Sequence, residues 1–155
     1  MHRVSQPMWK QAIPGRERGE IMSTSGNSFF DDADLIFGYS RAEAISDGVL
    51  VNVTKTAKEA GIRYHTCVTS AVWERYIKPD RTPGQSIAGR LWDTLWMFTT
   101  EVMRKHGARS TPSDCVMFKV SYVIKGRNRL VELKALCGPG DQGEPVLTIM
   151  LPEED

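Results

Sequence analysis

The sequence lacks any apolar run near the roughly 18 residues that a membrane-spanning helix requires. It also lacks the charged start, apolar stretch and small-residue cleavage site of a secretory signal peptide. We therefore expect a cytoplasmic protein with no membrane partner. The three cysteines, Cys67, Cys115 and Cys137, are far apart and form no CxxC motif. An odd number of isolated cysteines argues against a disulfide framework or a zinc site, so we expect no metal and interpret them as small buried hydrophobic residues.

A strong excess of charge of one sign is absent as well. The 20 Lys and Arg residues face 19 Asp and Glu residues, and the formal net charge is +1. Dedicated nucleic-acid binders usually carry a basic excess, because neutralisation of phosphates supplies most of their affinity. This chain has no such excess overall. Its 155 residues, of which 41% are hydrophobic and 25% charged, have the composition of one globular domain.

The first 28 residues carry no sustained hydrophobic periodicity and contain several Gly, Pro and Ser residues. We predict that residues 1–28 form a disordered N-terminal tail and that residues 29–155 form a single α+β domain. A sharper hypothesis places the native start at Met22, with residues 1–21 upstream of it. The acidic cluster Asp31, Asp32 and Asp34 lacks the glycine turn and the ligand spacing of a calcium loop, so we interpret it as solvated turn carboxylates.

Three short helices are indicated in the first half of this domain. Residues 40–43, Ser-Arg-Ala-Glu, have the form of a capping box, which predicts a helix that stops at Asp47-Gly48. Thr54 is expected to cap a second helix that ends at Gly61. A third helix is expected over residues 70–78, where the apolar side chains recur with helical spacing.

The strongest helical signal runs over residues 86–106. Apolar side chains recur there at intervals of three and four, at Ile87, Leu91, Leu95, Phe98 and Val102. Trp92, Trp96 and Met103 widen this stripe, and Ser86 can cap the start of the helix. We interpret the wide stripe as the face of a core helix, with the tryptophans and methionine used for packing rather than for a ligand site.

After Pro112 the apolar pattern changes from helical to alternating, which predicts two strands joined around Gly126. Glycine there suits the first central position of a type II′ turn. The resulting hairpin pairs Tyr122 with Val131, Val120 with Leu133, Phe118 with Ala135, and Lys119 with Lys134. A further strand over residues 145–151 is apolar on both faces except at Thr148, so we expect it to be central or covered on both sides. Residues 49–53, rich in β-branched side chains, predict another strand.

Together these elements predict an α+β fold. A long amphipathic core helix and short helices pack on a mainly antiparallel sheet, whose centre is a C-terminal three-stranded meander over residues 115–151. The tryptophan-bearing helix is expected to shield the inward side of that meander. Four residues should therefore share one core: Leu91, Leu95, Val120 and Leu133.

Several linked blocks of the sequence resemble a known family. They are YSRAEAISDGVLV at residues 39–51, AVW at 71–73, GRLWD at 89–93, GPGD at 138–141 and EPV at 144–146. These blocks are similar to those of short bacterial proteins of unknown function, over about residues 29–152. The resemblance implies a setting, that of a small accessory protein of plasmids and other mobile elements, with counter-defence against the host as one version of that role. It implies no catalytic residue and no cofactor.

Two of these blocks supply a candidate binding cleft, formed by Tyr39, Arg41, Asp47, Arg90 and Asp93. A guanidinium in a cleft can bind an anion through two parallel hydrogen bonds. The structural alternative, which we favour, is that the arginines tie elements together. Arg90 then pairs with Asp93 one helical turn away, or Arg41 meets Asp93 across the fold.

A second candidate is a basic ribbon on the predicted hairpin, made of Lys119, Lys125, Arg127, Arg129 and Lys134. A two-stranded ribbon can enter the major groove of DNA, so this hairpin is the best nucleic-acid feature of the chain. The alternative, which we favour, is solvated charge that protects a hairpin from aggregation. The glycine-rich loop at residues 138–143 leads into a strand and lacks the lysine of a phosphate loop, so we interpret it as a hairpin connection.

Recognised enzyme motifs are absent from the sequence, including nucleophile motifs, dinucleotide fingerprints and paired carboxylates. Cys67, with His65 two residues before it, is the only local candidate for a reactive thiolate. We therefore name no catalytic residue and no cofactor. The leading hypothesis is a non-catalytic interaction protein that binds a host or plasmid protein. Nucleic-acid binding through the ribbon comes second, and small-molecule catalysis comes third.

Overall fold

The computed structural model describes residues 39–78, 81, 83–108 and 113–155. In chain order its elements are α2 (Arg41–Ser46), β1 (Leu50–Asn52), α3 (Thr54–Glu59), β2 (His65–Thr69), α4 (Ser70–Val72), the π-helix η2 (Trp73–Ile77), α5 (Ile87–Gly107), β3 (Cys115–Ile124), β4 (Arg127–Pro139) and β5 (Pro145–Met150). No helix in these ranges combines the length and the apolar character needed to cross a membrane. The predictions for residues 1–28, for Met22 and for the acidic cluster at residues 31–34 lie outside the described residues.

The five strands form one sheet in the order β1-β2-β5-β4-β3. β2 and β5 pair in parallel, and the other neighbours are antiparallel. The predicted α+β class is thus confirmed. β5 lies in the middle of the sheet, which explains why it is apolar on both faces. Leu147 and Ile149 belong to the main core, and Val146 and Met150 are buried on the opposite face.

The strand beside β5, β2, was not predicted from the sequence. Its sequence, His-Thr-Cys-Val-Thr, mixes polar and apolar residues and does not alternate as a half-buried strand does. Thr66 is fully buried in β2, and its hydroxyl donates to the carbonyl of Tyr64 at 2.9 Å. This hydrogen bond satisfies the buried hydroxyl, so a polar residue is tolerated inside the sheet.

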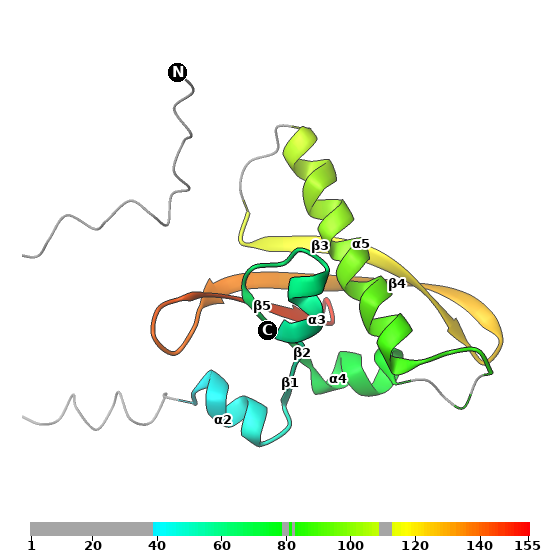
Figure 1. The fold of residues 1–155 in the computed structure, drawn as a ribbon, viewed down its shortest axis with the longest axis horizontal. Coiled ribbons are helices and arrows are strands. Elements are labelled where there is room, and N and C mark those ends of the chain that lie inside the picture. The colour runs from blue at the N-terminus through cyan, green and yellow to red at the C-terminus, as the bar shows by residue number, and fades with distance from the viewer. Residues whose placement is uncertain (1–38, 79–80, 82, 109–112) are drawn as a thin grey trace, which may run out of the picture. The chain divides into compact units, whose positions relative to one another are not determined.

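Helix α5 lies across one face of the sheet and covers β3 and β4 (Figure 1). Leu91 and Leu95 of α5 share a single buried cluster with Val120 and Leu133, as the sequence predicted. Ser86 caps the helix by accepting a hydrogen bond from the amide of Gly89, which also confirms the prediction. The core therefore sits between α5 and the strands of the C-terminal meander.

Four residues of the predicted apolar stripe do not enter this core. They are exposed, with 52% of the Trp96 surface accessible, and they are Ile87, Trp92, Trp96 and Met103. The two indole rings stack on each other, with centroids 6.2 Å apart. One residue turns the chain by about 100° around a helix axis, so Trp96 projects sideways when Leu95 points into the sheet. The interpretation of these residues as core packing was wrong.

The β3–β4 hairpin forms, but its register is shifted by two residues from the prediction. Val120 pairs with Val131 and Tyr122 with Arg129, and Lys119 lies opposite Glu132 rather than Lys134. The turn residues are Lys125 and Gly126, both with positive φ, which is the type I′ pattern rather than type II′. A shift of two residues leaves every side chain on the same face, so the apolar pattern cannot detect it.

The short helices agree with the sequence except at one cap. The capping box formed by Ser40 and Glu43 is present at the start of α2. Thr54 is the first residue of α3 rather than its cap, and its amide donates to the carboxamide of Asn52. The predicted helix at residues 70–78 is α4 followed by η2, whose wider turns end at Ile77.

Two leucines of β4 provide a direct test of this core. Leu133 has no exposed surface, whereas Leu130 is 69% exposed on the opposite face of the same strand. Leu133→Ala should lower the free energy of unfolding by about 2–5 kcal/mol, because it leaves a cavity. Leu130→Ala should change it by less than about 0.5 kcal/mol. Chemical denaturation of both variants measures the difference, and equal values would contradict the described core.

Candidate functional site

Arg41, at the start of α2, is bonded to β5. Its guanidinium donates to the hydroxyl of Thr148 at 2.7 Å and to the carbonyl of Leu147 at 2.8 Å. Thr148 alternates with core residues of β5, so its side chain lies on the sheet face opposite α5. Tyr39 donates to the carboxylate of Asp47 at 3.0 Å across the same helix. The structure thus brings Tyr39, Arg41 and Asp47 to one region around α2.

The glycine-rich loop at residues 138–143 provides the other half of this attachment. The carboxylate of Asp141 accepts hydrogen bonds from the amides of Arg41 and Ala42, at 2.7 and 3.0 Å. These two amides hold the pKa of Asp141 below its usual value. Within the loop, the amide of Gly140 donates to the carbonyl of Glu144. The loop connects a hairpin, as expected, and also docks α2 onto the sheet.

Arg90 and Asp93, the other members of the predicted cleft, lie elsewhere. Arg90 is only 4% exposed. Its guanidinium donates to the carbonyl of Tyr76 at 2.9 Å and to the carbonyl of Val123. Arg90 therefore ties the start of α5 to η2 and β3, on the sheet face opposite Arg41. Asp93 is exposed, and no ion pair joins it to Arg90 or Arg41 in the described part of the chain. The five residues do not form one cleft.

The cations of the predicted ribbon are divided between the two faces of the hairpin. Arg127 and Arg129 lie on the face that carries Tyr122, whereas Lys119 and Lys134 lie on the opposite face and Lys125 is in the turn. Lys134 is engaged by the backbone carbonyl of Glu154. This arrangement does not present the five positive charges as one continuous surface.

The three cysteines differ in burial. Cys67 is fully buried, but Cys115 and Cys137 are only partly buried, contrary to the sequence interpretation. Burial raises the pKa of Cys67, although Arg41 opposes that shift. Burial also raises the pKa of Cys137. Neither thiol is thereby activated as a thiolate. Within the residues described, no group of His, Cys, Asp and Glu side chains is placed to hold a metal ion.

The open edge of β3 is a feature that sequence analysis did not identify. Among the strands that the structure describes, β3 is outermost and pairs only with β4. Around a two-residue turn, alternate residues of a strand direct their amide and carbonyl groups away from the partner strand. In β3 these are the odd-numbered residues: the amide of Cys115 donates to Ser113, and the carbonyl of Val123 accepts from Arg90. The amide of Cys137 on β4 donates to Asp114, in agreement with that alternation.

Between these two anchored ends lie the outward backbone groups of Met117, Lys119 and Ser121. No hydrogen-bond partner for them is found among the described residues. A recess of about 370 Å³ adjoins this part of the edge, lined by Met97 and Thr100 of α5 and by Met117 and Lys119 of β3. The feature of the sequence that could have indicated this edge is the single charge among the ten residues of β3.

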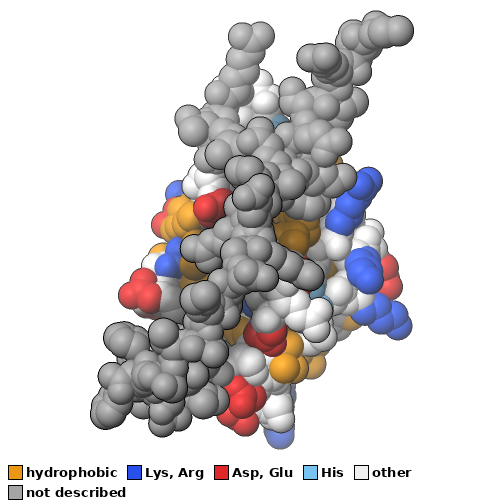
Figure 2. Space-filling view, turned by 90° about the vertical axis from the view of Figure 1, so that its left-hand side faces the viewer, with side chains coloured by type: hydrophobic (Ala, Val, Ile, Leu, Met, Phe, Trp, Pro, Cys, Tyr) orange, Lys and Arg blue, Asp and Glu red, His pale blue; other side chains and the backbone are white. Residues whose placement is uncertain are grey.

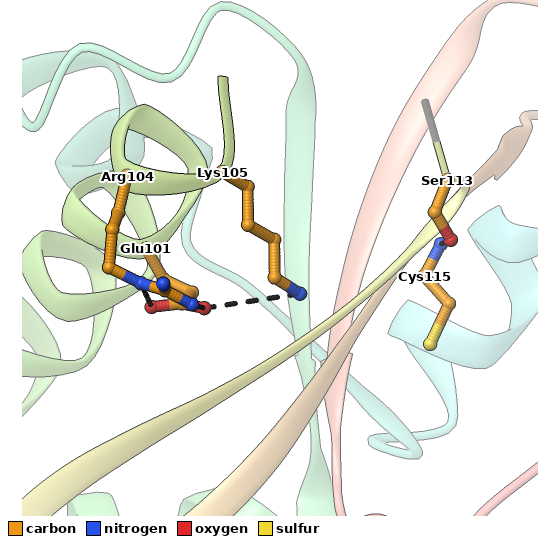
Figure 3. Close-up of polar contacts among 5 residues, drawn as sticks. All are labelled: Glu101, Arg104, Lys105, Ser113 and Cys115. Atoms are coloured by element: carbon orange, nitrogen blue, oxygen red, sulfur yellow. Dashed lines mark hydrogen bonds and ion pairs between the residues drawn. The ribbon is translucent and has the colours of Figure 1, made fainter. Parts of the chain in front are cut away.

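Charged side chains of α5 flank this recess. Arg104 binds the carboxylate of Glu101 through two nitrogens, at 2.7 and 2.9 Å (Figure 3). This bidentate contact lowers the pKa of Glu101 and raises that of Arg104. Both side chains therefore stay ionised at neutral pH, and their charges largely offset each other beside the strand edge.

The model of a family of unknown function, DUF6573, matches residues 26–155 of the chain. No curated protein and no solved structure matches it.

The docking of α2 by Asp141 predicts a pH-dependent stability. Because the folded-state pKa of Asp141 is lowered, its contribution is complete above the unfolded-state pKa of about 3.9 and is lost as the pH falls through the folded-state value. Asp141→Asn should therefore be less stable than the wild type at pH 7, and the difference should shrink in acid. Denaturation at several pH values measures it. The control is Asp93→Asn, which removes an exposed carboxylate on α5. If the difference in free energy of unfolding between the wild type and Asp141→Asn stays constant as the pH is lowered, the assigned role of Asp141 is contradicted.

Proposed function

This chain belongs to DUF6573, a family of unknown function, and from its geometry we propose that it is a non-catalytic protein-binding domain. It binds an extended segment of another protein as an additional strand on the open edge of β3. The setting inferred from the sequence resemblance, an accessory protein of a mobile element that binds a host or plasmid protein, is part of this proposal.

The observation that carries the proposal is the chemistry of the β3 edge. An edge strand offers unpaired amide and carbonyl groups to any extended chain, and proteins usually keep such edges short or charged. β1, at the other edge, follows this rule with three residues. β3 does not, because it has ten residues and Lys119 is its only charged side chain. Glu132 lies directly across from Lys119 and offsets that charge.

The surroundings of the edge favour a peptide that alternates in polarity. Successive side chains of an added strand point to opposite faces of the sheet. One set would lie on the α5 side of the sheet, near Met97 and Phe118, and the other would lie beside Met117, Lys119 and Ser121. Strand addition at an edge next to a helix is a common mode of peptide recognition, in which the backbone supplies affinity and the side chains supply specificity.

The two other hypotheses have less support from the described residues. Binding of nucleic acid by a ribbon needs its cations on one surface, and the hairpin divides them between two faces. Catalysis at the predicted cleft needs Arg41 and Arg90 together, and the sheet separates them. The β3 edge needs no rearrangement to pair with an extended peptide.

Proline substitution on β3 tests this function. The amide of Lys119 points away from β4, so Lys119→Pro removes an outward donor without removing a β3–β4 hydrogen bond. Peptides selected from a displayed random library on the wild-type protein are the probe. Lys119→Pro should weaken their binding about tenfold or more, through the lost hydrogen bond and the added ring. Hydrogen exchange should show protection by peptide at the amides of Met117, Lys119 and Ser121.

The matched control is Lys119→Thr, which removes the same charge but keeps the amide. It should bind the selected peptides within about twofold of wild type. If Lys119→Pro does not fold, Ser121→Pro provides the same test at the next outward amide. The proposal is wrong if the library yields no binder, if the proline variant binds as well as wild type, or if peptides protect α5 around Trp96 instead of β3.

A further inference from the structure

A second concave site lies at the opposite side of α5 from the β3 recess. It is a pocket of about 510 Å³ between the C-terminal half of α5, the segment that joins α3 to β2, and the sheet. Its apolar lining includes Ile62, Phe98, Val102, Ala135 and Leu147. This volume falls in the range of roughly 300–1,000 Å³ that is typical of small-molecule sites. On the face drawn in Figure 2, hydrophobic surface lies next to Lys and Arg side chains.

The pocket exists because the sheet carries small side chains under this part of the helix. Leu133 fills the space beneath α5 further along β4, but the next two inward positions of that strand are Ala135 and Cys137. Ala135 is paired with Val116 on one side and with Ile149 on the other, and Ala135, Val116 and Val102 all line the pocket. The pocket is therefore a result of the small size of these side chains and not of poor packing at the end of a secondary-structure element.

Charge at the pocket is unequal. Arg63, Lys105 and His106 lie along its lining, and Asp114 is the only carboxylate among the described residues that line it. Lys105 is 3.9 Å from the carboxylate of Glu101, which Arg104 already occupies at 2.7 Å. In Figure 3 the Lys105 side chain extends from α5, and a dashed line joins its ammonium group to the carboxylate of Glu101. An apolar interior with cations at its margin complements a ligand that has an apolar body and one anionic head.

We propose that this pocket binds a small amphipathic carboxylate, with its hydrocarbon body against Phe98, Ala135 and Leu147 and its carboxylate near Lys105 and Arg63. This site is independent of the β3 edge, because the two lie on different flanks of α5 and share no lining residue. The ligand class follows from the combination of an apolar interior, a sufficient volume and a net positive margin.

Calorimetry with decanoate tests the proposal, with decanol and decyltrimethylammonium as head-group controls. Decanoate should bind saturably below the concentration at which it forms micelles, and more tightly than either control. NMR shift changes should be confined to residues that line the pocket, such as Ala135, Cys137 and Leu147. Absence of binding, or preference for the cationic analogue, would overturn the proposal.

Two variants test separately the contacts of the hydrocarbon body and those of the carboxylate head of the ligand. Ala135→Leu fills the pocket and should lower decanoate affinity at least tenfold; Cys137→Leu is the substitute if that variant does not fold. Lys105→Glu reverses one marginal charge, so it should weaken decanoate binding about tenfold and leave decanol binding unchanged. If Ala135→Leu or Cys137→Leu is folded and binds decanoate as tightly as the wild type does, decanoate binds at another site and the proposal is wrong. An equal loss for decanol and decanoate in Lys105→Glu would also contradict the assigned orientation.

Discussion

The packing of α5 against the sheet is the contact on which the rest of the structure depends. Leu95 and Leu133 are buried completely between them, and the aromatic ring of Phe98 meets that of Phe118 edge-on. At the start of the helix, Arg90 binds backbone carbonyls on both η2 and β3. Toward its other end the helix covers Ala135 and Cys137, which are too small to fill the space. The same helix is thus fixed at one end and spans a pocket at the other.

Both proposed sites follow from this asymmetry. The recess beside β3 and the pocket above Ala135 each use the C-terminal half of α5 as one wall. Neither site requires a residue from the predicted cleft around Arg41 and Arg90. Those arginines are used to hold α2 and α5 in place, which is the structural alternative that the sequence favoured. The two proposed surfaces therefore lie where the packing leaves space or leaves a strand edge open.

Local signals in the sequence were sufficient for much of the fold. Ser40 and Ser86 mark the starts of α2 and α5, and the spacing of Leu91 and Leu95 identifies the buried face of the long helix. Long-range contacts left no such signal. The carboxylate of Asp141 caps α2 from a distant hairpin loop, and nothing near Arg41 in the sequence indicates it. The missing strand β2 has the same cause, since its burial depends on β5 rather than on its own pattern.

The candidate site was harder to predict than the fold. Charge and sequence motifs single out arginines and lysines, whereas the β3 edge is defined by backbone groups, which every residue carries. The single charge among ten residues of β3 was visible in the sequence, but only the strand order showed that β3 is an edge. Trp92 and Trp96 were wrongly predicted to be buried. Hydrophobic spacing indicates which face of a helix is apolar, but it does not indicate how much of that face the sheet covers.

The parallel pairing of β2 with β5 also bears on how the protein is made. β2 lies near the middle of the chain, and β5 is the last strand. On the ribosome, β2 emerges well before β5 and has only the three residues of β1 beside it, among the described strands, until β5 has been made. The described strands therefore complete their sheet only after β5 is synthesised, so they fold as one cooperative unit.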